Sequence, residues 1–222
     1  ARGKIVVVGG GFGGATCARY LRRIGPELDV TLVEPNETFV TCPFSNTVVG
    51  GMNGVDAISH RYDGVRRAGV TVIHDRAARI DSAARTVRLA GGASVPYDRL
   101  VLSPGVDIKW QAIPGYDEAA AEIMPHAWKA GPQTLLLRRQ LEAMPDGGVV
   151  AMTIPPNPYR CPPGPYERAS LIAYYLKTRK PRSKLLLIDA KDTFSKQPLF
   201  LEGWMLLYGD LVEWLPFAKV GR

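Results

Sequence analysis

The chain begins with an apolar run that leads directly into a cluster of glycines. Residues 4–8 (Lys-Ile-Val-Val-Val) have the pattern of a buried strand, and the glycine cluster follows at 9–14. Apolar residues at helical spacing predict a helix from 15 to about 24, and a second apolar run at 30–33 ends in Glu34. This order of strand, helix and strand predicts the start of a doubly wound parallel sheet.

Smaller elements are expected in the middle of the chain, where apolar runs are short and separated by turn residues. They are a helix at 57–68, a short strand at 70–74, paired strands at 85–89 and 94–97, and a buried strand at 97–102.

The order of strand, helix and strand recurs in the second half. We expect a helix at 135–144, a strand at 148–154, a helix at 167–177 and a strand at 184–188. The repetition predicts an α/β fold with tandem Rossmann-like FAD/NAD(P)-binding domains, each with a mostly parallel sheet between two outer layers. We place the first segment of an FAD-binding domain at 1–113 and a second dinucleotide-fold domain at 114–222. Few residues follow the last strand, so we expect the second domain to be incomplete and the chain to be truncated at its C-terminus.

Composition excludes several classes of protein. Apolar residues make up 46% and charged residues 22%, which is ordinary for a globular chain and excludes disorder, collagen and coiled coil. The net charge of +7 is spread along the chain, and its densest run, at 177–184, suits a solvated helix end better than a nucleic-acid surface. We expect no transmembrane segment. The three histidines lack metal-ligand spacing, so we expect no metal.

The glycine cluster has the spacing of a dinucleotide-binding turn. Gly9 permits the tight turn, Gly11 lets the backbone approach a pyrophosphate, and Gly14 lets the helix pack on the strand. Free N–H groups at the helix start favour phosphate, and Glu34 is placed to accept hydrogen bonds from a ribose. The segment 97–105 resembles the second flavin signature of two-dinucleotide-domain flavoproteins, although it has Ser-Pro-Gly where that signature has Ala-Thr-Gly. FAD is therefore favoured over NAD at this site.

The three cysteines lie in different surroundings, and their odd number leaves at least one outside any internal disulfide. Cys17 lies on the expected apolar face of the first helix, which favours a small buried side chain. Cys42 lies in the loop after Glu34, at the sheet edge where ligands bind in this fold. Its thiol can reach the 8-methyl edge of a flavin and form a thioether; a free loop cysteine is the alternative.

Cys161 lies in a proline-rich loop at the position where a second dinucleotide site would have its glycines. Proline has no N–H to offer a phosphate, so this loop is expected to bind pyrophosphate poorly. The loop instead holds a cysteine stiffly before a helix start, next to Arg160, and both features favour the thiolate. A redox-active sulfur beside the flavin is the functional interpretation, and an inert structural cysteine is the alternative.

Several of these stretches together resemble the flavoprotein subunit of flavocytochrome c sulfide dehydrogenase, within the superfamily of sulfide:quinone reductase-like flavoproteins. The stretches are 8–16, 31–36, Tyr62-Asp63-Gly64, 125–131, Phe194-Ser195-Lys196-Gln197 and, most specifically, Cys161-Pro162-Pro163-Gly164-Pro165-Tyr166-Glu167-Arg168.

The resemblance implies an oxidoreductase of electron transport in the periplasm, its signal peptide already removed, that oxidises sulfide with FAD. A c-type cytochrome partner would receive the electrons and carry the haem, forming a heterodimer with this chain. Cys42 would hold FAD covalently, and Cys161 would be the catalytic half of a redox-active disulfide whose second cysteine lies outside this chain. The cofactor-binding residues would be Gly9, Gly11, Phe12, Gly13, Gly14, Glu34, Pro35, Asn36, Ala77, Pro104 and Gly105.

Two other functions stay open. One is a sulfide:quinone or NAD(P)H-dependent flavin disulfide oxidoreductase, although a nicotinamide coenzyme would need glycines where this chain has prolines. The other is an inactive fragment that folds only with a partner. A flavin spectrum that survives acid precipitation would exclude the second of these.

Overall fold

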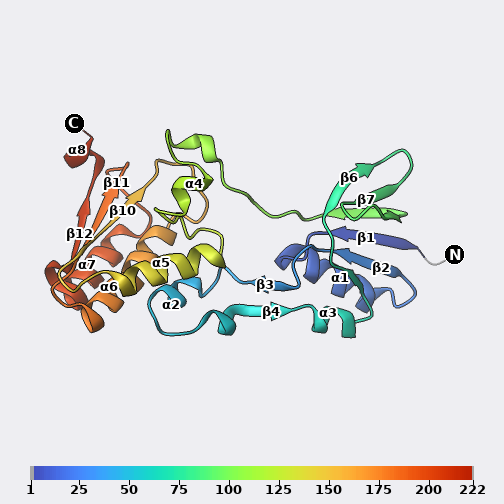
Figure 1. Ribbon diagram of the computed structural model, residues 1–222, viewed down its shortest axis with the longest axis horizontal. Helices are drawn as coiled ribbons and strands as arrows, with labels where there is room; N and C mark the ends of the chain where they lie inside the picture. The colour runs from blue at the N-terminus through green and yellow to red at the C-terminus, as the bar shows by residue number, and fades with distance from the viewer. Residues whose placement is uncertain (1–2, 222) are drawn as a thin grey trace. The chain divides into compact units, whose positions relative to one another are not determined.

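The computed structural model describes residues 3–221, which divide into two compact units (Figure 1). The first unit comprises the described residues up to Val40 together with Ser59–Ile113. The second comprises Thr41–Ile58 and the described residues from Pro114 onward.

A parallel sheet forms the centre of the first unit. Its strands lie in the order β5 (Thr71–Ile73), β2 (Asp29–Val33), β1 (Lys4–Val8) and β9 (Arg99–Leu102). Successive side chains of a strand point to opposite faces, so Val7 joins one apolar cluster and Val6 joins another. Because both faces are covered, β1 is an unbroken apolar run rather than an alternating one.

Helices cover one face of this sheet and a second sheet covers the other. Helices α1 (Phe12–Ile24) and α3 (Asp63–Arg67) contribute Ala18 and Val65 to the first cluster. The other cluster is closed by Val87 and Leu89 of an antiparallel sheet. That sheet consists of β6 (Ala77–Asp81), β7 (Thr86–Leu89) and β8 (Ser94–Pro96). The remaining elements are the antiparallel pair β3 (Thr38–Val40) and β4 (Ser59–Arg61) and the 3-10 turn Trp110–Ala112.

The second unit is built on a parallel sheet of β10 (Val149–Ile154), β11 (Lys184–Asp189) and β12 (Val212–Leu215). Its helices are α2 (Ser45–Val49), α4 (Glu118–Ala121), α5 (Pro132–Ala143), α6 (Gly164–Arg179), α7 (Gln197–Tyr208) and α8 (Phe217–Val220), with 3-10 turns at Val55–Ile58 and Gly209–Leu211. Residues 41–58 group with this unit because α2 packs on α5 and α6 and Val49 is buried in the shared core (Figure 1).

The α/β class with parallel sheets is confirmed. The strand, helix and strand expected at each end of the chain are present, and the expected apolar face of α6 is confirmed because Ala169, Ile172, Ala173 and Leu176 are all buried. The paired strands on either side of residues 91–92 are confirmed as β7 and β8.

Three local predictions are wrong, and one helix was not predicted. The helix expected at 57–68 is interrupted by β4, because Ser59–Arg61 pairs with Thr38–Val40. The buried face of α1 is centred on Gly14 and Ala18, which approach the sheet, and so Cys17 is half-buried rather than buried. Leu102 of the expected buried strand is 57% exposed, because β9 lies at the edge of its sheet. Helix α7 has no counterpart among the expected elements, and it exposes five large apolar side chains: Leu199, Leu201, Met205, Leu206 and Leu207.

Candidate functional site

The first candidate site is the glycine turn between β1 and α1. Gly9 has φ +98° and donates its N–H to the Val33 carbonyl at 2.9 Å. A Cβ on Gly9 would lie 2.1 Å from the Ser103 carbonyl oxygen, and one on Gly14 would lie 1.8 Å from the Gly9 carbonyl oxygen. At Gly11 the nearest atoms to a Cβ belong to Phe39, 3.7 Å away. The first and third glycines are therefore needed for packing, whereas the second leaves open backbone that a pyrophosphate could approach.

Glu34 is fixed against this turn. Its side chain is buried, and its Oε2 accepts the Gly10 N–H at 2.8 Å. Its Oε1 accepts both the backbone N–H of Asn36 at 2.9 Å and the Asn36 amide at 2.8 Å. A carboxylate can accept about four hydrogen bonds, so acceptor capacity remains for a ribose hydroxyl. Pro35 lies between these two residues.

Sequence reasoning missed Tyr62 at this site. Its hydroxyl donates to the Gly10 carbonyl at 3.0 Å, and a Cβ on Gly10 would lie 2.6 Å from that hydroxyl oxygen. Burial, with a smaller contribution from Glu34, raises the pKa of Tyr62 and keeps the phenol neutral. Tyr62 begins one of the stretches that carry the family resemblance, and that position was the available signal.

The other expected cofactor residues lie around the same edge of the sheet. Asn36 follows β2, Pro104 and Gly105 follow β9, and Ala77 begins β6. Phe12 begins α1, is 59% exposed, and packs edge-on against Phe39 at 5.3 Å between ring centroids. Gly13 lies close to the Ser103 hydroxyl, where a Cβ would be 2.7 Å away.

A dinucleotide fits this arrangement in two respects beyond the glycines. The carboxyl ends of parallel strands meet at one edge of a sheet, which is where ligands bind in this fold. Helix α1 has no side-chain hydrogen bond at its N-cap Gly11, so its first N–H groups are available to a phosphate.

We expect Gly14→Ala to lower the free energy of unfolding by about 3 kcal/mol, because its methyl group would overlap a carbonyl oxygen. Gly203→Ala in α7 is the matched control. No atom lies within 4 Å of the position that its methyl group would take, so we expect a gain of up to about 1 kcal/mol from helix propensity. Urea unfolding measures both changes, and a Gly14→Ala protein as stable as wild type would contradict the close approach.

The second candidate site is a cluster of two thiols in the second unit. Cys42 Sγ donates to the Trp128 carbonyl oxygen at 3.8 Å. A Cβ on Gly164 would lie 3.2 Å from Cys161 Sγ and 3.5 Å from the Trp128 ring, so Cys161 lies near the ring of the same tryptophan. All three cysteines are free thiols, and Cys42 and Cys161 are both exposed. The thiols are therefore available for chemistry and share one neighbour.

Cys161 has an unusual backbone for a residue with a side chain. Its φ is +62°, in the left-handed region, and its carbonyl accepts the Gly164 N–H at 2.8 Å at the start of α6. Non-glycine residues in this region cost of order 1–3 kcal/mol and are concentrated at functional sites. The proline-rich loop thus holds the thiol in a conformation that a free chain would seldom adopt.

Arg168, also missed from the sequence, belongs to α6 and lies near both thiols. It is 8% exposed, and its guanidinium stacks over Trp128 at 5.8 Å from the ring centroid. Burial lowers its pKa to about 10, and the nearby thiols Cys42 and Cys161 oppose that change, so it stays charged at neutral pH. Arg168 ends the stretch 161–168 that carries the family resemblance most specifically, and that position was the available signal. Its role could not be read from the stretch alone, because its partners come from distant parts of the chain.

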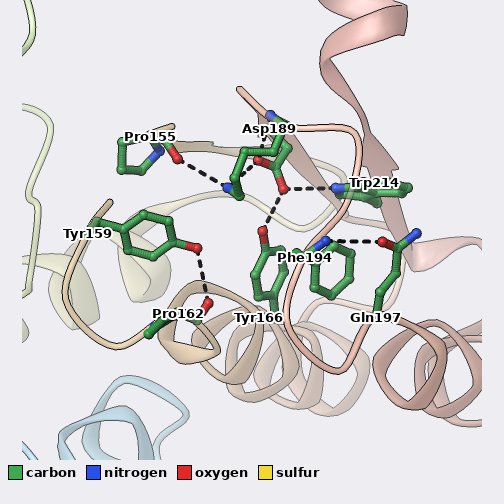
Figure 2. A network of polar contacts seen from close by, with 9 residues as sticks. Pro155, Tyr159, Pro162, Tyr166, Asp189, Phe194, Gln197 and Trp214 are labelled. Atoms are coloured by element: carbon green, nitrogen blue, oxygen red, sulfur yellow. Dashed lines mark hydrogen bonds and ion pairs between the residues drawn. The ribbon is translucent and has the colours of Figure 1, made fainter. Parts of the chain in front are cut away.

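The carboxyl edge of the second sheet is closed by a buried polar network (Figure 2). Asp189 ends β11, as Glu34 follows β2, but it is fully buried. Its carboxylate accepts four hydrogen bonds, from the Tyr166 hydroxyl at 2.6 Å, the Trp214 indole at 3.1 Å, the Lys191 ammonium at 2.6 Å and the Lys191 backbone N–H at 3.1 Å. Tyr166 in turn stacks on Phe194 with ring centroids 3.7 Å apart. Protein donors therefore occupy the acid that would otherwise meet a ribose.

Two kinds of feature are absent from residues 3–221. No helix there is long and apolar enough to cross a membrane. No group of three or more metal-ligating side chains comes together within the same range.

Two family models match most of the chain in succession. Residues 3–133 match the model described as pyridine nucleotide-disulphide oxidoreductase. Residues 134–221 match the model described as the central part of the sulfide dehydrogenase (flavocytochrome c) flavoprotein chain.

Individual relatives agree with these models. The flavoprotein chain of sulfide dehydrogenase (flavocytochrome c) from Chlorobaculum thiosulfatiphilum is 67% identical over 45 residues, which are 20% of this chain and 94% of that sequence. The sulfide-quinone reductase of Aquifex aeolicus is 31% identical over 182 residues, 82% of this chain and 41% of the relative. The X-ray structure of sulfide:quinone oxidoreductase from Aquifex aeolicus superposes with a TM-score of 0.73 at 25% identity, over 97% of this chain and 51% of that one.

This chain thus spans about two fifths of the curated sulfide:quinone relatives. The matches confirm the resemblance to the sulfide dehydrogenase flavoprotein and imply FAD as the cofactor. With more than half of its residues matched by one family model, the chain belongs to the pyridine nucleotide-disulphide oxidoreductase family.

Proposed function

We propose that the protein containing this chain oxidises sulfide with bound FAD and passes the electrons to a c-type cytochrome partner. The observation that carries the proposal is the gathering of Cys42 and Cys161 around Trp128 and Arg168 in the second unit. The flavocytochrome c name of the matching family model and of the 67% identical relative supports the choice of acceptor. The haem would be on the partner, and the protein would work in the periplasm.

The first unit would hold the ADP part of FAD. Gly11 and the start of α1 would face the pyrophosphate, and Glu34 would accept from the ribose. The residues expected to line the rest of the cofactor are Phe12, Gly13, Pro35, Asn36, Ala77, Pro104 and Gly105. When bound, FAD would supply a group that can accept two electrons and release them one at a time.

The second unit would supply the sulfur chemistry. Cys42 would hold the flavin through a thioether to its 8-methyl carbon. Cys161 would form a disulfide with a cysteine outside residues 1–222, and sulfide would attack it. Attack breaks the S–S bond, leaving a persulfide on one sulfur and a thiolate on the other. The exposure of Cys161 suits this role, since the attacking anion must reach the sulfur.

We infer that the second unit does not take a nicotinamide coenzyme. Its strand-to-helix loop, 155–163, is rich in prolines that cannot donate to a phosphate. The buried network around Asp189 adds a second obstacle, because the acid is already satisfied by Tyr166, Trp214 and Lys191.

A sulfide:quinone oxidoreductase is the second candidate, and it is favoured by the mouse and Aquifex aeolicus relatives, which match 86% and 82% of this chain. The two candidates share the flavin and the cysteine chemistry. They differ in the electron acceptor.

Anaerobic titration of the intact protein tests the proposal. We expect sulfide to bleach the flavin absorbance and NADH to leave it unchanged, and we expect turnover with cytochrome c but not with a soluble ubiquinone analogue. Turnover with the quinone alone would favour the second candidate. Bleaching by NADH would contradict the inference about the second unit, and a colourless, flavin-free protein would contradict both candidates.

A further inference from the structure

We propose that Arg168 is a positioning residue that keeps a fixed positive charge facing both Cys42 and Cys161 and so promotes the reactions in which negative charge develops on their sulfurs. The inference deepens the proposed function and rests on it for the use made of the two sulfurs. Its test needs neither flavin nor sulfide.

The first support is the way in which Arg168 is anchored. Its Nε donates to Asn46 Oδ1 at 3.0 Å, its Nη1 to the His126 carbonyl at 2.8 Å, and its Nη2 to the Ala127 carbonyl at 2.6 Å. These partners come from α2 and from the segment before α5, whereas Arg168 belongs to α6. One side chain therefore joins the elements on which the thiols depend, and the planar fork of an arginine suits such a three-way contact.

The second support is the position of Trp128, the residue after these two carbonyls. Ala127 has φ +44°, a left-handed conformation that an alanine rarely adopts, and its carbonyl is the one nearest to Arg168. This turn places the Trp128 carbonyl on Cys42 Sγ and the Trp128 ring beside Cys161. Arg168 thus holds in place the segment whose next residue lies near both sulfurs.

The third support is the charge itself. No carboxylate in residues 3–221 forms an ion pair with Arg168, and its three acceptors are neutral oxygens. Buried cations are costly unless they are compensated. The titratable groups that face Arg168 are Cys42 and Cys161, together with His126 on the segment that it anchors. Negative charge that develops on either sulfur during a reaction would be the missing counter-charge, and the adjacent cation would stabilise it.

The test compares thiol reactivity in Arg168→Gln and Arg168→Lys. The intact protein is reduced with dithiothreitol, desalted and treated with iodoacetamide across a range of pH, and the peptides of each cysteine are quantified by mass spectrometry. At neutral pH we expect Cys42 and Cys161 of Arg168→Gln to react about tenfold more slowly than in wild type. Arg168→Lys retains the charge and is expected to stay within about threefold.

Two controls separate charge from structure. Asn46→Ala removes one hydrogen bond but leaves the charge, so the rates of both thiols should stay close to wild type. Cys17 belongs to the first unit and should react equally in every variant. Rates in a folded Arg168→Gln protein equal to wild type would overturn the proposal. If Arg168→Gln fails to fold, Arg168→Lys decides: retained rates support the charge, and a tenfold loss at both thiols overturns it.

The outcome is distinguishable from failure of the proposed function. If the protein has no acid-stable flavin but Arg168→Gln still slows the reaction of the thiols, the covalent tether is refuted and the role of Arg168 is retained. Where Cys42 already carries flavin, Cys161 alone is measured.

Discussion

Cys161→Ser is expected to abolish sulfide-dependent bleaching of the flavin, with a loss of at least about a thousandfold in rate. A serine hydroxyl cannot form the disulfide that sulfide would attack, and it is a far weaker nucleophile than a thiolate. The side chain is exposed at the start of α6, so the substitution should leave the core of the second unit intact. Anaerobic stopped-flow spectroscopy in the full-length protein measures the rate.

Cys17→Ser is the matched control for this experiment. Cys17 is half-buried on α1, and the proposed chemistry gives it no role. Its rate should remain close to wild type. Near-normal bleaching in Cys161→Ser would remove this cysteine from the mechanism.

Cys42→Ser is expected to convert the flavin from acid-stable to fully extractable. The thioether is lost, but the glycine turn of the first unit is unchanged, so FAD should remain bound until the protein is denatured. Precipitation with trichloroacetic acid, followed by the absorbance of pellet and supernatant, measures the change. Cys161→Ser is the control and should keep its flavin in the pellet; acid-stable flavin in Cys42→Ser would refute the tether.

Most of the fold could be predicted where the hydrophobic pattern is local. Each such element is specified by residues close together in the sequence. Examples are the apolar run 4–8, the glycines after it and the apolar face of α6. The helix expected at 57–68 failed because β4 depends on pairing with β3, about twenty residues earlier. Helix α7 was missed because it is apolar on nearly every side and so has no helical periodicity.

The residues of the candidate sites also fall into two groups, those that local sequence marks and those that depend on contacts between distant segments. Glycines, Glu34 and the cysteines are recognisable because their chemistry follows from residue type and spacing. Tyr62 and Arg168 are not, because their importance depends on carbonyl groups of Gly10, His126 and Ala127. Such contacts exist only after distant segments meet.

The buried Asp189 network has a consequence for redesign of coenzyme specificity. Grafting a glycine-rich loop in place of 155–165 would restore phosphate donors but leave Asp189 occupied by Tyr166, Trp214 and Lys191. An engineer seeking a nicotinamide-driven variant would have to free that carboxylate as well, and doing so would open a cavity beneath the stacked ring of Phe194. Evolution toward nicotinamide use would face the same requirement for simultaneous changes, since new phosphate donors alone would leave the Asp189 carboxylate occupied.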